Sequence, residues 1–328
     1  MDEMGEMVEM DEMNAPDAPG APVSLTIPSA AAGQRLDRVL GLVFPGLGLR
    51  RLRRVFAENE VTVDGRARQA AFRVRAGAEV RVRLRPGVVR PGTGAVPAGL
   101  AVLAQGADYG AVDKPGGLAT ASIGPGGQES LEDHLGGLFP GREPVLLGRL
   151  DTATSGIVAV AFSPEAVRQF RLAEDRGEAE KTYLAVVQGR IEAPFTTARE
   201  LDTAHRVKTR VRDRDTDDPL RRTAVTPLGH DPGTGLTLVR AVIAKGARHQ
   251  IRAHLAAMGH PILGDALYGN ASEGGGRLFL HHARIIFPGF TAVSNPPWSR
   301  PGGGSVLGIG PGVEQALDDV VLANEIGS

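Results

Sequence analysis

The feature that most constrains the fold is a series of short apolar runs, each about one strand long, in residues 100–290. Such runs, bounded by turn-forming residues, predict buried strands. They are YGAVD (109–113), GIVAVAF (156–162), TYLAVVQG (182–189), LTLVRAVI (236–243) and LFLHHARIIF (278–287). Helical patterns interrupt them at 163–177 and 247–259. Because strands and helices do not alternate regularly, we expect an α+β domain with a mixed, mainly antiparallel sheet rather than a doubly wound one.

A smaller pattern precedes this region, in residues 23–85. Leu36, Val39, Leu40 and Val43 recur at helical spacing, and a second helix is predicted over 50–60, where apolar residues interleave with arginines. Strand-like segments follow at 61–65, which ends in an Asp-Gly turn signal, and at 79–84. We therefore expect a small α/β module before the larger domain.

The remaining segments suggest the domain boundaries. Residues 1–22 lack apolar periodicity and predict a disordered acidic tail. The Pro- and Gly-rich stretch 86–99 is typical of a linker. We expect the larger domain at 100–300 and a C-terminal extension at 301–328, with a last helix near 313–327.

Charge is distributed unevenly along the chain. Residues 1–17 carry seven acidic and no basic side chains, so the rest of the chain has a net charge of +6. Between Gln34 and Arg85, thirteen arginines stand against five acids. Such a density is expected of a surface that binds a polyanion, nucleic acid first among them, although a basic surface without a ligand would show the same pattern.

Composition excludes several classes of site. The chain has no cysteine, which removes disulfides, thiolate catalysis and every cysteine-ligated zinc or iron-sulfur site. No window approaches the roughly 18 to 20 consecutive apolar residues of a membrane span, and the first residues are acidic where a signal peptide would be basic. We expect no membrane association and a cytoplasmic location.

The segment GRLDTATSG, residues 148–156, is the first candidate for chemistry. Asp151 stands in a turn directly before a buried strand, and loops held by a rigid sheet are where catalytic groups concentrate. A turn aspartate that bonds its own backbone would look the same. Arg149 could pair with Asp151 or hold a phosphate, and local spacing does not decide between these.

The second candidate is EAEKTYLAVVQG, residues 178–189. Side chains alternate along a strand, so Lys181, Tyr183 and Ala185 should share one face. The chain has only three tyrosines, and Tyr183 is either a core ring with a satisfied hydroxyl or a functional one.

The third candidate is KGARHQIRAHLAAMGHPILGDALYG, residues 245–269. A helix over 247–259 would place Arg248, Arg252 and Leu255 along one side, and Gly259 would cap it. The histidines at 249, 254 and 260 suggest a metal site. Their spacing argues against it, because positions five apart on a helix do not converge and no HExxH pattern accompanies them.

In this order, the three segments resemble those of the RluA-type RNA pseudouridine synthases, which carry HRLDxxTSG, KxYxAxVxG and GRxHQIRxHLxxxGHPIxGDxxYG. AVDKPGGL (111–118) and LFLHHARIIF also match, so the resemblance spans about residues 100–290. RLDRVL and VTVDG in the small module resemble the RNA-binding domain named after ribosomal protein S-four. This chain departs from the pattern at three points: Gly148 replaces the usual histidine, Ala247 the usual arginine, and ARIIFPGF lacks the usual histidine-proline.

The resemblance implies a fold and an activity: a pseudouridine synthase sheet domain that isomerises uridine in RNA, most of all large-subunit ribosomal RNA. It assigns the catalytic carboxylate to Asp151 and its pairing partner to Arg252. Tyr183 would stack near the uracil and is the candidate for handling the base proton. Arg149 would fill the gap left by a flipped nucleotide or hold its backbone. We also expect RNA contacts from Lys181, His249, Arg35, Arg50, Arg51, Arg53 and Arg54.

Two other functions stay open at this point. One is a catalytically inactive RNA-binding or ribosome-assembly protein, against which the presence of Asp151, Tyr183 and Arg252 counts. The other is a metal-dependent hydrolase built on the histidines. For the synthase we expect no cofactor, no metal and a monomer.

Overall fold

The structure is a computed structural model, and it describes residues 23–43, 56, 60–83, 96–121, 129–204, 207–269, 275–298 and 309–326. The chain divides into two compact units. The small module lies within residues 1–94, with which segments 123–128 and 140–143 are grouped, and the sheet domain is formed by residues 95–122, 129–139 and 144–328. The predicted tail at 1–22 and most of the predicted linker lie outside the described residues.

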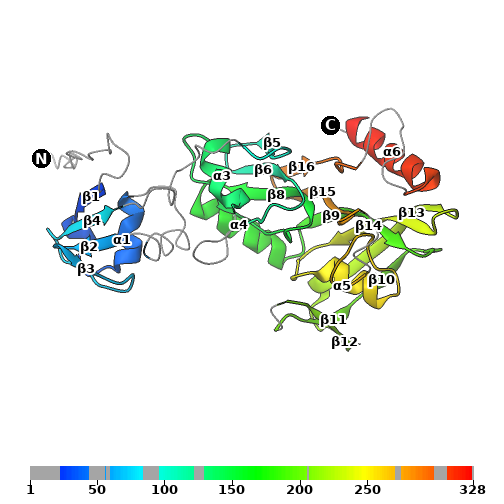
Figure 1. Ribbon diagram of the computed structural model, residues 1–328, viewed down its shortest axis with the longest axis horizontal. Coiled ribbons are helices and arrows are strands. Elements are labelled where there is room, and N and C mark those ends of the chain that lie inside the picture. Colours follow the sequence, from blue (N-terminus) through cyan, green and yellow to red (C-terminus); the bar gives the residue numbers. More distant parts are fainter. Residues whose placement is uncertain are drawn as a thin grey trace, which may run out of the picture. The chain divides into compact units, whose positions relative to one another are not determined.

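The small module contains an antiparallel sheet, an α-helix and a short 3-10 helix (Figure 1). Its strands run in the order β1-β4-β2-β3. The elements are β1 (Val23–Thr26), a short 3-10 helix (Ser29–Ala31), α1 (Leu36–Val43), β2 (Glu60–Val63), β3 (Arg66–Ala67) and β4 (Glu79–Arg83). The predicted helix over 50–60 lies outside the described residues except for Phe56, which is helical, and Glu60, which begins β2 instead.

Local sequence explains this module well. Leu36, Val39 and Leu40 of α1 are buried in its core, as their spacing predicts. The β2–β3 turn is made by Asp64 and Gly65 with φ values of 51° and 73°, the positive pair that a two-residue hairpin of this type requires. Strand β4 alternates between buried valines and exposed arginines, so the module presents a basic surface to solvent.

The sheet domain is built on a ten-stranded mixed sheet. Its main path is β10-β13-β14-β9-β15-β8-β6-β5, with β16 on β15 and β7 on β8. The strands are β5 (Ala101–Gln105), β6 (Tyr109–Lys114), β7 (Val145–Leu146), β8 (Ser155–Ala161), β9 (Glu180–Gln188), β10 (Phe195–Thr197), β13 (Thr223–Asp231), β14 (Leu236–Ile243), β15 (Leu280–Phe287) and β16 (Phe290–Val293). Among the described strands only β8 and β15 pair in parallel, so the expected mixed, mainly antiparallel α+β sheet is confirmed.

Within its described residues, the domain also has four α-helices, one 3-10 turn and a separate hairpin. They are α3 (Leu131–Leu138), α4 (Pro164–Asp175), α5 (Gln250–Ala257), α6 (Pro311–Ile326), the 3-10 turn Pro219–Arg221, and the antiparallel pair β11 (Arg199–Asp202) and β12 (Arg210–Asp215). Within the described part of the chain, no helix is both long enough and apolar enough to cross a membrane.

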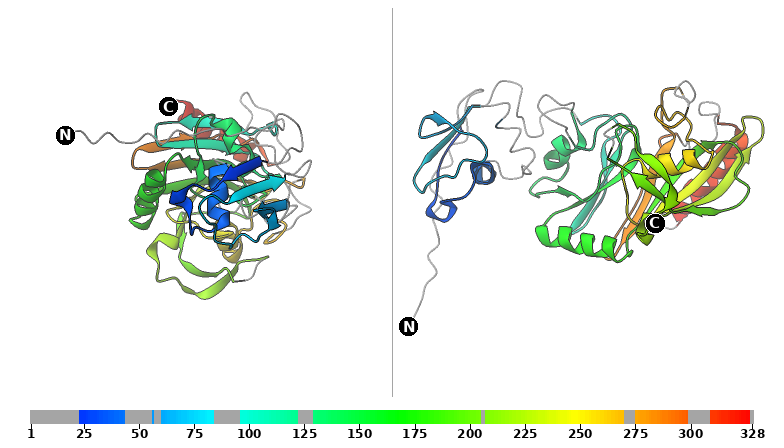
Figure 2. Two further views of the ribbon diagram at one scale, coloured as in Figure 1. Left: turned by 90° about the vertical axis from the view of Figure 1, so that its left-hand side faces the viewer. Right: turned by 90° about the horizontal axis from the view of Figure 1, so that it is seen from below.

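Helices cover both faces of the central strands. Ile157 and Ala159 of β8 pack with Phe170 of α4, whereas Val158 and Val160 pack with α3 on the other side. The right-hand view in Figure 2 shows α4, in green, beside the strands of this domain. This two-sided covering explains why β8 reads as an unbroken apolar run, since every one of its residues is buried.

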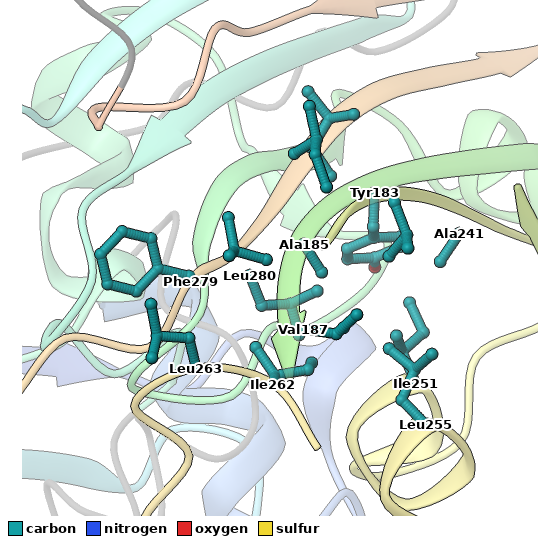
Figure 3. Packing of buried hydrophobic residues seen from close by; sticks show 14 of the residues in the cluster. Tyr183, Ala185, Val187, Ala241, Ile251, Leu255, Ile262, Leu263, Phe279 and Leu280 are labelled. Atoms are coloured by element: carbon teal, nitrogen blue, oxygen red, sulfur yellow. The ribbon is translucent and has the colours of Figure 1, made fainter. Parts of the chain in front are cut away.

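A second core lies around β9 and β14. Figure 3 shows Tyr183, Ala185 and Val187 of β9 on one side of the strand, close to Ala241 and to Ile251 and Leu255 of α5. Helix α6 packs against β13 and β14 and contributes Val313 and Leu317 to the same core. The last predicted helix is therefore part of the sheet domain.

Helix α5 differs from the prediction at its start. It begins at Gln250 rather than Ala247, because His249 adopts a left-handed conformation with φ 55°, which interrupts a right-handed helix. The predicted alignment of Arg248 with Arg252 on one helix side is therefore wrong. The predicted cap is confirmed: Gly259 has φ 86°, and the next backbone N–H, that of His260, bonds the Leu255 carbonyl.

We predict that Gly156→Ala destabilises the sheet domain by about 3 kcal/mol. Gly156 has φ +108°, and a Cβ there would lie 2.7 Å from the backbone nitrogen of His282 on β15. Urea unfolding followed by the fluorescence of Trp298, the only tryptophan and a core residue of this domain, measures the loss. Gly148→Ala is the control, because nothing lies within 4 Å of its Cβ and its φ is not positive. Equal stabilities of the two variants would contradict the prediction.

We also predict that the sheet domain loses stability as pH falls below 6.5. Burial lowers the pKa of His281 to about 4 and of His282 to about 3, so in this range the unfolded chain takes up protons that the folded chain does not. Between pH 6.5 and 5 the two histidines together lower the free energy of unfolding by about 3 kcal/mol. His281→Asn should halve this dependence in urea unfolding curves. An equally steep loss in the variant would show that His281 does not contribute.

Candidate active site

Asp151 lies in the loop between β7 and β8, and backbone contacts fix this loop. The Thr120 hydroxyl donates to the Leu150 carbonyl at 2.8 Å and accepts from the Leu150 N–H at 3.1 Å. The carbonyl of Thr152 accepts from the Gly117 N–H at 2.8 Å. The Asp151 side chain is 23% exposed. A solvent-accessible carboxylate is thus held on a rigid loop at the start of a buried strand.

The buried side chain of Lys114 contacts the same loop. Its side chain is fully buried, and its ammonium donates to the carbonyls of Pro115, Leu118 and Thr152 at 2.9, 2.7 and 3.3 Å. Burial lowers the pKa of Lys114 to about 8, against the opposing charges of Asp151 and Asp113. Sequence reasoning found the AVDKPGGL segment but gave this lysine no role. Its position in a buried apolar strand was the available signal, since lysine is rarely buried without partners.

Arg252 comes from α5 and meets Asp151 across 101 positions of sequence. Its Nη1 donates to Asp151 Oδ2 at 2.9 Å, so the pairing that the resemblance implied is present. The reading of Asp151 as a turn aspartate that bonds its own backbone is not supported, because its carboxylate bonds Arg252 instead. Burial alone would lower the pKa of Arg252, but hydrogen bonds and charges from Asp265 and Asp151 raise it.

Tyr183 lies on β9 with its ring held in the core. The ring stacks on His282 of β15, with centroids 4.4 Å apart and planes inclined by 14°. Only 8% of the residue is exposed. Burial, and then the charge of Asp151, raise the pKa of Tyr183, so its hydroxyl is neutral at pH 7. Nothing in the sequence connected His282 to Tyr183, because the two residues meet only through strand pairing.

His249 lies on the other side of Asp151. Its Nε2 is 3.7 Å from Asp151 Oδ1, and its Nδ1 is 3.2 Å from the hydroxyl of Tyr268. That hydroxyl also accepts from the Thr209 N–H at 2.8 Å, just before β12. Burial lowers the pKa of His249, and Asp151 opposes this shift. The strained backbone of His249 thus places an imidazole beside the carboxylate.

The remaining predicted RNA-contact residues differ in exposure and in their ion-pair partners. Arg149 is exposed two residues before Asp151, as expected of a group that reaches RNA. Lys181 is buried and forms an ion pair with Glu174 of α4, so its ammonium is not available to a phosphate while that pair is intact. Arg35 pairs with Asp37 at 2.8 Å in the small module. Arg50, Arg51, Arg53 and Arg54 lie outside the described residues.

The three histidines of the third segment have separate partners. His254 contacts Thr223 Oγ1 and the Arg199 carbonyl, each at 2.9 Å, and His260 Nδ1 is 3.0 Å from the Gln188 carbonyl. In the part of the chain that the structure describes, no group of three or more histidine, aspartate or glutamate side chains could hold a metal ion. This geometry gives no support to the metal-dependent alternative.

Comparison with known proteins shows to which family the chain is similar. The family model described as RNA pseudouridylate synthase matches residues 108–257, which contain Asp151, Tyr183 and Arg252. An uncharacterized RNA pseudouridine synthase of Helicobacter pylori strain J99 is 30% identical over 169 residues. That match covers 51% of this chain and 57% of the H. pylori protein, so it spans little more than half of that relative.

Two further matches cover a larger share of both this chain and the other protein. Ribosomal large subunit pseudouridine synthase D of Xanthomonas campestris is 31% identical over 258 residues, which is 75% of this chain and 74% of that protein. The solved structure of human RNA Pseudouridylate Synthase Domain Containing 1 shares the fold with a TM-score of 0.55 and 23% identity, and the match covers 71% of this chain and 97% of that one. With the ordered motifs, the mixed sheet and the Arg252–Asp151 pair, these matches show that the chain belongs to the RNA pseudouridylate synthase family.

Proposed function

We propose that this protein isomerises uridine to pseudouridine in RNA, with Asp151 as the catalytic carboxylate. The observation that carries the proposal is the bond from the buried guanidinium of Arg252 to the partly exposed carboxylate of Asp151, beside the ring of Tyr183. A neighbouring guanidinium gives a carboxylate a charge-assisted hydrogen bond and sets its direction. An ionised carboxylate is what the first step needs.

The reaction consumes no second substrate. The bond between C1′ of the ribose and N1 of uracil breaks, the base turns, and a bond between C1′ and C5 forms. The hydrogen on C5 leaves as a proton, and N1 gains one. Asp151 serves the first step either as a nucleophile at C1′ or as a base at the neighbouring ribose carbon, and both routes require it ionised.

The uridine has to leave its stack before Asp151 can reach the ribose, at a cost of a few kcal/mol. Arg149, exposed next to the carboxylate, is placed to fill the gap or hold the backbone of the flipped nucleotide. Tyr183 offers its ring to the uracil. As a neutral phenol it donates a hydrogen bond readily but is a weak base at pH 7, so we assign it to holding the base rather than to taking the C5 proton.

Large-subunit ribosomal RNA is the substrate class that we propose. The X. campestris relative is named for the large ribosomal subunit. The small module, whose described surface is rich in exposed arginines, would bind RNA phosphates without regard to sequence, as its resemblance to the S-four RNA-binding domain implies. A monomeric state and a cytoplasmic location stay predictions from sequence.

Asp151→Asn tests the proposed chemistry. The amide is neither a nucleophile nor a base, so we expect tritium release from large-subunit ribosomal RNA labelled at C5 of uridine to fall at least 1,000-fold, an order-of-magnitude expectation for a lost catalytic group. RNA affinity should change by less than about 3-fold, since the carboxylate is not a phosphate contact. Asp108→Asn, an exposed aspartate directly before β6, is the control and should keep wild-type activity.

The outcomes separate the alternatives. Normal tritium release by Asp151→Asn would overturn the assignment of Asp151. If the wild-type protein binds ribosomal RNA and releases no tritium, the protein is an RNA-binding or assembly factor without this activity.

Replacing Arg50, Arg51, Arg53 and Arg54 together by glutamine tests the role of the small module. Each lost phosphate contact flattens the dependence of log affinity on log salt by about 0.7 to 0.9, so we expect the slope to fall by up to about 3 and the dissociation constant to rise about 10-fold or more. The single-turnover rate at saturating RNA should be unchanged. The matched control is Arg168→Gln with Arg190→Gln, two exposed arginines of the sheet domain. An unchanged salt slope in the fourfold variant would contradict this role.

A further inference from the structure

Arg252 is shared between two carboxylates, and the second has no role in the proposed reaction so far. Asp265 lies in the turn after α5, and it receives two of the arginine's hydrogen bonds. Arg252 Nε donates to Asp265 Oδ2 and Arg252 Nη2 to Asp265 Oδ1, each at 2.8 Å. The one remaining described bond of Arg252, from Nη1, goes to Asp151.

Asp265 is itself held rigidly. Its side chain is fully buried. Its Oδ1 also accepts the backbone N–H groups of Leu267 and Tyr268 at 2.9 and 3.1 Å. The ring of Tyr268, fixed by the same turn, lies 5.5 Å from the guanidinium carbon of Arg252, within the range of a cation–π contact. The guanidinium is thus held by a carboxylate and a ring that belong to one turn.

This arrangement decides how Arg252 meets Asp151. A guanidinium prefers to grip a carboxylate with two parallel N–H bonds. Here Asp265 holds the edge formed by Nε and Nη2, and the guanidinium fixed in this way reaches Asp151 through Nη1, in one bond on Oδ2. Within the described residues, Asp151 Oδ1 accepts no hydrogen bond, and the nearest charged-group nitrogen to it is His249 Nε2 at 3.7 Å.

We propose that Asp265 is a positioning residue for this reaction: by holding the Nε–Nη2 edge of Arg252, it directs Nη1 to Asp151 Oδ2 and leaves Asp151 Oδ1 free to act on the ribose. The inference rests on the proposed function of Asp151. Without Asp265, Arg252 would turn toward its only remaining carboxylate and engage both of its oxygens. Asp265 also balances the charge of Arg252, so the buried cluster of Arg252 with its two carboxylates keeps one negative charge for the reaction.

The test compares single-turnover tritium release from C5-labelled large-subunit ribosomal RNA for wild type, D265N, R252K and the double variant. Asparagine keeps the size of Asp265 but loses its charge and one acceptor oxygen. We expect D265N to lower the rate at saturating RNA by about 30- to 100-fold, because small misplacements of catalytic groups have effects of this size. The RNA concentration for half-maximal rate should change by less than about 3-fold, since Asp265 is buried away from RNA.

The double variant distinguishes positioning from a general structural role. If Asp265 acts through Arg252, then D265N should cost less than about 3-fold when it is added to R252K, because lysine has no two-pronged edge to direct. The matched control is D231N. Asp231 is a buried carboxylate of the same domain that accepts the N–H groups of Thr234 and Gly312, on strand β13. Its variant should lose stability in Trp298-monitored unfolding but keep the single-turnover rate.

Three outcomes would overturn the proposal: a wild-type rate for D265N, equal fold-losses from D265N in the wild-type and R252K backgrounds, or an equal rate loss in D231N. If D265N does not fold, D265E takes its place, since it keeps the charge but moves the guanidinium by about one bond length. We expect D265E to lose at least about 10-fold in rate, and a wild-type rate would contradict the proposal. Failure of the proposed function would look different, because the wild-type protein itself would then release no tritium.

Discussion

The site depends on the pairing of one buried positive charge, that of the Arg252 guanidinium. Arg252 is almost completely enclosed, and an unpaired charge in that position would destabilise the domain by several kcal/mol. Asp151 and Asp265 neutralise it from two loops, at the start of β8 and after α5. Because both loops and α5 must be in place for the charge to be paired, the fold of the sheet domain and the geometry of the candidate site are coupled.

The sheet supplies the rigidity that this pairing requires. Strands β8 and β9 both pair with β15, one on each side of it. This pairing brings the loop before β8, which carries Asp151, close to Tyr183 on β9. Lys114 joins the Asp151 loop, through the Thr152 carbonyl, to the segment after β6, through the carbonyls of Pro115 and Leu118, and His282 supports the ring of Tyr183. In the proposed reaction the nucleotide of the RNA therefore moves, and it enters a site that is already formed.

Much of the fold could be predicted from sequence, because it depends on local patterns. The apolar runs became strands of the sheet, Asp64 and Gly65 made their turn, and Gly259 ended α5. The start of α5 could not be predicted, because the left-handed backbone of His249 is held by contacts to Asp151 and Tyr268 that are distant in sequence. Lys181 shows the same limit, since its charge suggested RNA and its partner is Glu174 of α4.

The sequence by itself determined the strand-rich α+β class, the positions of the carboxylate, tyrosine and arginine motifs, and the basic character of the small module. These follow from side-chain periodicity, turn chemistry and charge, which act over a few residues. Only the tertiary structure decided that Arg252 divides its hydrogen bonds between Asp151 and Asp265, and that Lys114 and His282 support the site. The bonds of Arg252 to Asp265 and Asp151 join residues 13 and 101 positions apart, and no local pattern records the direction in which a buried guanidinium points.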